Sequence, residues 1–157
     1  MLDNTKRRTI KCIQVHKVCR VTKPGMPLKA YEERNVFKLF LVDTGLLAAM
    51  GDIDAKTLLD GNAIFTEFKG ALTEQYVHQQ LSSAGKYVLY YWSAEHSTAE
   101  VDFLIQCNGV IAPVEVKAEE NLQAKSLKVF SEKFKPVVSV RTSMSDFREQ
   151  DWLVSMQ

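Results

Sequence analysis

The segment from Glu100 to Lys117 constrains the fold more than any other part of the chain. Two runs of alternating residues lie on either side of Asn108-Gly109, the dipeptide that gives the strongest short signal for a β-hairpin. With Asn108 and Gly109 as the two turn residues, one face of the hairpin is wholly apolar, and a slip of one residue would destroy that sorting. The opposed pairs on this face are Val101 with Val116, Phe103 with Val114, Ile105 with Ala112, and Cys107 with Val110.

The other face of the hairpin places Asp102 opposite Glu115, and Glu100 opposite Lys117. Opposed side chains on one face have Cβ atoms about 5 Å apart, and like charges at that distance are destabilising. A divalent cation between the carboxylates would remove this conflict, because hard cations take carboxylate oxygens as ligands. The alternative is a solvated polar face on which Lys117 neutralises Glu115 and Glu100. The residues of the hairpin leave both interpretations open.

The same residues carry a family resemblance. Asp102 on the first strand, followed by Glu115-Val116-Lys117 on the second, resembles the PD-(D/E)xK motif of restriction-endonuclease-like nucleases. Further segments are similar to one family, the domain of unknown function at the C-terminus of many prokaryotic AAA-type ATPases. The resemblance covers residues 10 to 150, and the segments that carry it are Phe37 to Leu47, Gly70 to Val77, Tyr90 to Trp92 and Ala99 to Phe103.

The resemblance implies a nuclease-like site. Asp102 and Glu115 would hold Mg²⁺ or Mn²⁺, Glu74 on the preceding helix would add a third carboxylate, and Lys117 would orient a water or offset charge on a phosphate. Glu74 has an alternative role as a surface residue that pairs with His78 four positions later. We expect His78, like His16 and His96, to be an ordinary histidine at the surface or at its boundary.

The fold class expected is α/β, with a restriction-endonuclease-like αβββαβ core, an N-terminal β-ribbon and short helices. Residues 1–9 are expected to be a disordered or trimmed tail, residues 10–61 the ribbon and short helices, and residues 62–157 the nuclease-like domain. Pattern and capping signals place the elements as follows: strands at 10–21 and 36–42, helices at 43–50 and 62–83, a strand at 87–92, the hairpin, a helix from 119 to Pro136, and strands at 137–141 and 152–154.

Composition narrows the function without fixing it. The net charge of +1 gives no overall basic footprint, so any contact with DNA must come from a local patch. The lysines on the last expected helix are the best candidates for that patch: Lys125, Lys128, Lys133 and Lys135. Three cysteines without zinc spacing favour a reducing, cytoplasmic location, and no apolar run reaches the length of about 18 residues that a membrane span needs.

Two classes of function therefore compete. One is a metal-dependent DNA phosphodiesterase joined to an AAA-type ATPase, and the other is a non-catalytic module of the same ATPase that binds nucleic acid or protein. The sequence contains no G-x-x-x-x-G-K-[ST] segment, so ATP binding is expected only in an ATPase domain that this chain lacks.

Overall fold

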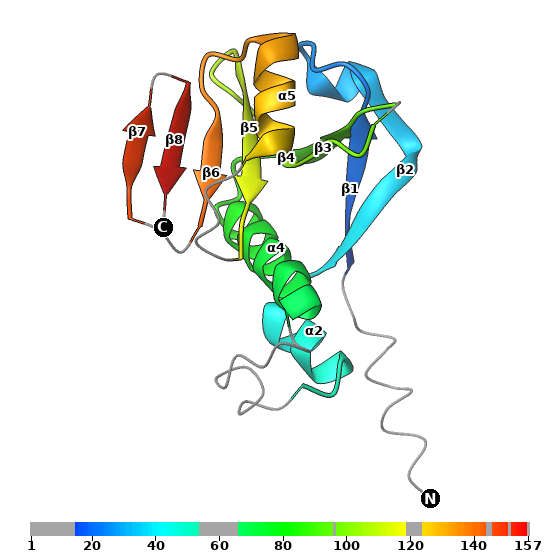
Figure 1. The fold of residues 1–157 in the computed structure, drawn as a ribbon. Coiled ribbons are helices and arrows are strands. Elements are labelled where there is room, and N and C mark those ends of the chain that lie inside the picture. The colour runs from blue at the N-terminus through cyan, green and yellow to red at the C-terminus, as the bar shows by residue number, and fades with distance from the viewer. Residues whose placement is uncertain are drawn as a thin grey trace, which may run out of the picture.

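The protein is an α/β domain built on one mixed sheet, as its computed structural model shows (Figure 1). The structure describes residues 15–53, 66–95, 97–118, 124–143, 146–150 and 152–156. The eight strands follow the order β2-β1-β3-β4-β5-β6-β8-β7. The expectations for residues 1–14, for residues 62–65 at the start of the long helix, for His96 and for the helix start at 119 lie outside the described residues.

The order of the central elements agrees with the predicted order of helix, three strands, helix and strand. Strand β6 lies parallel to β5, with Glu115 beside Arg141, as a crossover through a helix requires. The described elements are β1 (Val15–Val21), the 3₁₀ helix η1 (Leu28–Tyr31), β2 (Glu32–Leu41), α2 (Thr44–Met50), α4 (Thr66–Ser83), β3 (Leu89–Ser93), β4 (Glu100–Cys107), β5 (Val110–Val116), α5 (Lys125–Phe134), β6 (Val140–Thr142), β7 (Arg148–Gln150) and β8 (Leu153–Met156).

The N-terminal ribbon of β1 and β2 belongs to the same sheet as the strands β3 to β8. The two strands pair antiparallel, and β1 then pairs parallel with β3. Strand β3 is buried on both faces, as its run of apolar residues predicts. Strand β7 was not predicted, because its three residues, Arg148–Gln150, carry no apolar pattern.

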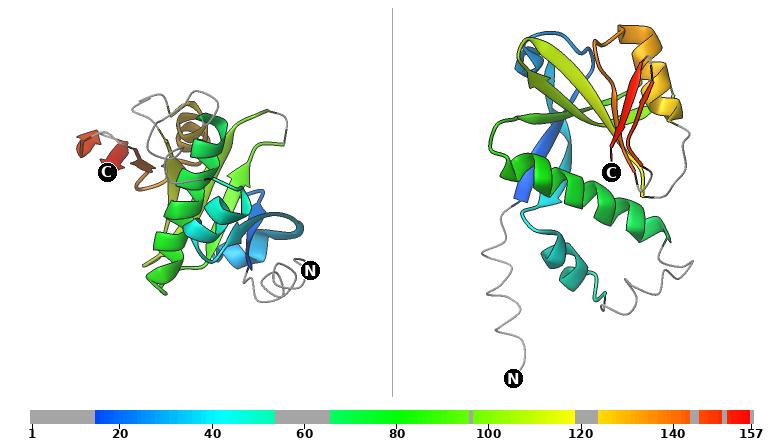
Figure 2. Two further views of the ribbon diagram at one scale, coloured as in Figure 1. Left: turned by 90° about the horizontal axis from the view of Figure 1, so that it is seen from below. Right: turned by 90° about the vertical axis from the view of Figure 1, so that its left-hand side faces the viewer.

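The two faces of the sheet carry separate apolar clusters. On one face, Trp92 and Leu104 pack with Leu127 and Phe130 of α5. On the other face, a cluster of Phe40, Leu89, Tyr91, Phe103, Ile105 and Val114 packs with side chains of α4. The views in Figure 2 show the two helices in different layers, with α4 (green) crossing the sheet and α5 (orange) beside the C-terminal strands.

The predicted hairpin forms in the predicted register. Cys107 pairs with Val110, and the pairing continues to Phe103 and Val114. Asn108 and Gly109 have φ angles of 49° and 79°, the left-handed region that a two-residue type I′ turn requires at both positions.

One part of the hairpin prediction is wrong. Val101 does not share a face with Phe103, because β3 and β4 shift register between Tyr90 and Trp92. This β-bulge turns the start of β4, so that Val101 packs with Leu104 on the α5 side while Phe103 packs on the α4 side. The alternation of the sequence alone gives no sign of the extra residue.

The spacing of three and four predicts an apolar stripe on α4, whose described members are Phe68, Leu72, Tyr76, Val77 and Leu81, and Val77 and Leu81 pack against the core cluster as this stripe requires. Leu72 is buried as expected, but the Tyr76 side chain is 54% exposed. His78, expected at the surface, is buried, with its ring stacked on Phe40 at a centroid distance of 4.4 Å. Gln75 is also buried, and its amide donates to the carbonyl oxygen of Leu41 and accepts from the Leu41 N–H.

The short helix α2 begins as predicted. Asp43 is its N-cap, and the Asp43 Oδ1 atom accepts a hydrogen bond of 3.0 Å from the Leu46 N–H. None of the helices that the structure describes is long and apolar enough to cross a membrane.

Candidate functional site

The candidate site lies at the fork, the place where β4 and β5 separate, with Asp102, Glu115 and Lys117 around it. The pairing of the two strands ends at Phe103 and Val114, one pair before Asp102 and Glu115 would face each other. Asp102 instead extends its side chain to β5, where its Oδ2 atom accepts a hydrogen bond of 2.7 Å from the Val116 N–H. The carboxylate therefore takes the place of a main-chain acceptor and holds the fork together.

Glu115 is a buried carboxylate with one satisfied oxygen. Its side chain is 3% exposed, and its Oε1 atom lies 2.7 Å from Lys117 Nζ, the neutralising contact that the sequence allowed. The Oε2 atom is buried without a hydrogen-bond partner among the described residues. An unsatisfied buried acceptor costs free energy, about 1–3 kcal/mol and more when it is charged. Glu115 Oε2 is thus an atom for which a ligand would be favourable.

A second group of charges gathers beside the fork, around an ammonium that the sequence analysis did not single out. Lys38 Nζ, from β2, lies 2.7 Å from Glu74 Oε1, 2.6 Å from Glu100 Oε1 and 3.9 Å from Asp102 Oδ1. Glu74 therefore pairs with Lys38, whereas the hydrogen-bond partner of His78 is Ser82. The signal for Lys38 was its position as the one charged residue in the apolar run from Val36 to Val42.

The electrostatics of the site centre on Asp102. Burial of this carboxyl and the negative charge of Glu74 raise its pKa to about 7, with a smaller contribution from Glu115. The Val116 N–H and Lys38 oppose the shift. Burial would lower the pKa of Lys38, but Glu74 and Glu100 outweigh it, so that the pKa of Lys38 is raised above its ordinary value. The predicted carboxylates are therefore close enough to affect one another.

The oxygens at the fork suit a hard cation, although the ligand set is small. The part of the chain that the structure describes contains no group of three or more His, Cys, Asp or Glu residues that could hold a metal ion. Glu115 Oε2 has no hydrogen-bond partner among the described residues, and Asp102 Oδ1 lies 3.9 Å from Lys38 Nζ. Mg²⁺ commonly binds through one or two carboxylates and completes its shell with waters and substrate phosphates. Metal binding by Asp102, Glu115 and Glu74 stays a prediction.

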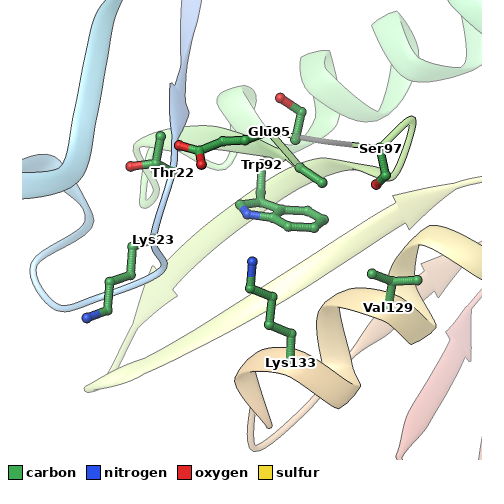
Figure 3. A pocket seen from close by; sticks show the side chains of 9 residues that line it. Thr22, Lys23, Trp92, Glu95, Ser97, Val129 and Lys133 are labelled. Carbon is green, nitrogen blue, oxygen red and sulfur yellow. The ribbon is translucent and has the colours of Figure 1, made fainter.

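A cavity of about 480 Å³ lies beside α5, and two lysines, Lys23 and Lys133, are among the residues that line it (Figure 3). The Lys133 ammonium lies 5.9 Å from the ring centroid of Trp92, and the Lys23 ammonium points away from that ring in Figure 3. Of the four lysines predicted to meet phosphates, Lys128 lies 3.9 Å from Glu132 and Lys135 caps the end of α5. The cavity is lined by Thr22, Lys23, Trp92, Ser93, Ala94, Glu95, Ser97, Val129 and Lys133.

Comparison with known proteins gives one match. The model of one family, described as "Domain of unknown function (DUF4143)", matches residues 69–157, more than half of the chain. This segment contains Glu74, Asp102, Glu115 and Lys117, whereas Lys38 lies before it. No curated protein and no solved structure matches the chain.

Proposed function

The chain belongs to the DUF4143 family, a family of unknown function, and from the residues at its fork we propose that it is a metal-dependent phosphodiesterase domain. The observation that carries this proposal is the carboxylate of Glu115, which is buried and paired with Lys117, together with the partly exposed carboxylate of Asp102 at the same fork. Among the described residues, Glu115 Oε2 has no hydrogen-bond partner, and Asp102 Oδ1 lies 3.9 Å from Lys38 Nζ. Such a concentration of oxygen ligands beside a cationic side chain suits a cation and a phosphate together.

Mg²⁺ or Mn²⁺ bound by Asp102 and Glu115 would supply a Lewis acid for the phosphoryl oxygen and a lower pKa for a bound water. Lys117 contributes a fixed positive charge, because Glu115 Oε1 holds its ammonium at 2.7 Å. That charge stabilises a phosphate at the fork and the negative charge that develops on it. Asp102 also maintains the shape of the fork through its bond to the Val116 N–H.

The proposed substrate is DNA, and its phosphates extend beyond the fork. Lys23 and Lys133 line the cavity beside α5, and Lys125 is an exposed residue at the start of the same helix. Lysines spaced along one surface neutralise successive phosphates and release counterions. The choice of DNA over RNA rests on the resemblance to restriction-endonuclease-like enzymes, which is an argument from fold.

A non-catalytic module is the second candidate, and a specific observation favours it. Lys38 and Lys117 already pair with Glu74, Glu100 and Glu115, so part of the acidic charge is neutralised within the protein. In this proposal the domain, joined to a cytoplasmic AAA-type ATPase, binds nucleic acid or protein without cutting. The covalent link would raise its effective concentration at whatever the ATPase engages, so weak intrinsic affinity would suffice.

Cleavage of DNA at low salt separates the two functions. With Mn²⁺ or Mg²⁺ present, we expect the protein to nick plasmid DNA, and we expect Lys117→Ala to remove the nicking while gel-shift binding of the DNA survives. The matched control is Lys86→Ala, which changes an exposed lysine remote in sequence from the motif. If the unaltered protein binds DNA without nicking it, the non-catalytic module is favoured. If it neither binds nor nicks DNA, both nucleic-acid functions are excluded.

A further inference from the structure

The group of charges around Lys38 has a composition that an ordinary surface salt bridge lacks. A single ammonium faces three carboxylates, those of Glu74, Glu100 and Asp102, and their side chains are between 20% and 40% exposed. By contrast, Arg20 pairs with a single carboxylate among the described residues, that of Glu33, and also donates a hydrogen bond to the Ser93 hydroxyl. The Lys38 cluster therefore keeps an excess of negative charge when its carboxylates are ionised.

The fold places Lys38 in this cluster from a distance in the sheet. Strands β1 and β3 lie between β2 and β4 in the strand order, yet the Lys38 ammonium reaches Glu100 and Asp102 on β4. On its way it passes the ring of Tyr91, whose centroid lies 5.2 Å from Nζ. Its neighbour on the same face, Phe40, is anchored in the α4-side cluster. Packing around the Lys38 side chain therefore fixes the position of its ammonium.

From this geometry we infer that Lys38 is the internal counter-ion of the candidate metal site and competes with the metal for Asp102 and Glu74. The inference rests on the proposed function, since it concerns how that same site controls its cation. Two positive charges that share the same carboxylates repel each other, and this repulsion is strong in a partly buried site. A divalent ion that uses Asp102 Oδ1 must therefore displace Lys38 or bind against its charge.

The consequence is a site that binds its metal weakly until a phosphate arrives. A phosphodiester brings negative charge and additional oxygen ligands, which offset the repulsion from Lys38. Because Lys38 lies outside the matched segment 69–157, strand β2 adds this control from the N-terminal ribbon. The role assigned to Lys38 is that of a positioning residue, which acts through the carboxylates that it holds.

The test compares Lys38→Met with the matched control Arg20→Met, because Arg20 has the same 23% side-chain exposure and also pairs with a glutamate. We expect Lys38→Met to bind Mn²⁺ about tenfold or more tightly than the unaltered protein in calorimetry, a change of about 1.4 kcal/mol. We also expect its melting temperature to be lower in EDTA and to rise more on addition of Mn²⁺. Arg20→Met should leave the Mn²⁺ affinity unchanged.

Equal or weaker Mn²⁺ binding by Lys38→Met would overturn the inference. If Lys38→Met does not fold, Lys38→Gln, which keeps a hydrogen-bond donor without the charge, is measured in its place. Tighter Mn²⁺ binding by Lys38→Gln supports the inference, and equal or weaker binding overturns it. Glu115→Gln in the unaltered background separates the two proposals. If it binds Mn²⁺ as well as the unaltered protein, the fork is not the metal site, whereas the comparison at Lys38 still decides whether this ammonium opposes a cation.

Discussion

At the scale of single residues, Asp102 combines a structural and a chemical role. Its Oδ2 atom accepts the hydrogen bond from the Val116 N–H, while burial and the charge of Glu74 raise its pKa to about 7. A carboxyl whose pKa is higher in the folded protein than in the unfolded chain binds its proton more tightly when folded. The unfolded chain loses that proton near the ordinary value of 3.8, so the folding stability falls as the pH rises from about 4 to about 7.

This titration gives a prediction at the same scale. We expect Asp102→Asn to remove the pH dependence that Asp102 contributes in metal-free buffer. The free energy of unfolding of the variant, relative to the unaltered protein, should therefore rise between pH 4 and pH 7 and stay constant above pH 8. Urea unfolding in EDTA at several pH values measures this difference. A difference that does not change with pH would show that Asp102 has the same pKa in the folded and unfolded chains.

At the scale of elements, the attachment of α4 to β2 positions Glu74 and Lys38 relative to each other. Gln75 follows Glu74 on α4, and its buried amide makes two hydrogen bonds to the main chain of Leu41, at 2.9 Å and 2.6 Å. Gln79 adds bonds to the N–H and hydroxyl of Thr44 at the start of α2. Gln75 and Gln79 thus make hydrogen bonds to main-chain groups at and just beyond the end of β2, where a neighbouring strand would otherwise make them.

Replacement of Gln75, whose amide joins α4 to β2, should therefore lower the folding stability. We expect Gln75→Met, which keeps most of the volume, to lower the free energy of unfolding by about 1–3 kcal/mol, because it removes both hydrogen bonds to the part-buried main chain of Leu41. Chemical denaturation measures the change, and Gln80→Met, at an exposed position of the same helix, is the control. A loss as small as that of the control would mean that water satisfies Leu41 equally well.

At the scale of the whole molecule, the parts that local pattern determines were predictable and the parts that depend on tertiary contacts were not. The Asn108-Gly109 turn, its register and the order from α4 to β6 agree with the sequence analysis. The β-bulge opposite Tyr91 and the insertion of Lys38 among carboxylates depend on strands distant in sequence, which no local pattern records.

His78 on α4 is another residue whose environment the local sequence pattern did not predict. A histidine beside the apolar stripe of α4 suggests the surface, but the buried part of α4 is wider than that stripe and includes Gln75 and His78. The Gln75 amide hydrogen-bonds to the main chain of Leu41 at the end of β2. Polar residues whose side chains hydrogen-bond to an edge strand cannot be recognised from the sequence until it is known that this strand packs against the helix.

The proposed function requires that the fork between β4 and β5 hold a divalent cation through Asp102 and Glu115. The most direct test is calorimetric titration of Mn²⁺ into the metal-free protein and into Asp102→Asn, with Glu149→Gln on the exposed strand β7 as the control. We predict one site in the unaltered protein and in the control, and an affinity at least about tenfold weaker in Asp102→Asn. Equal Mn²⁺ affinity in all three proteins, or no binding in any of them, would contradict the claim.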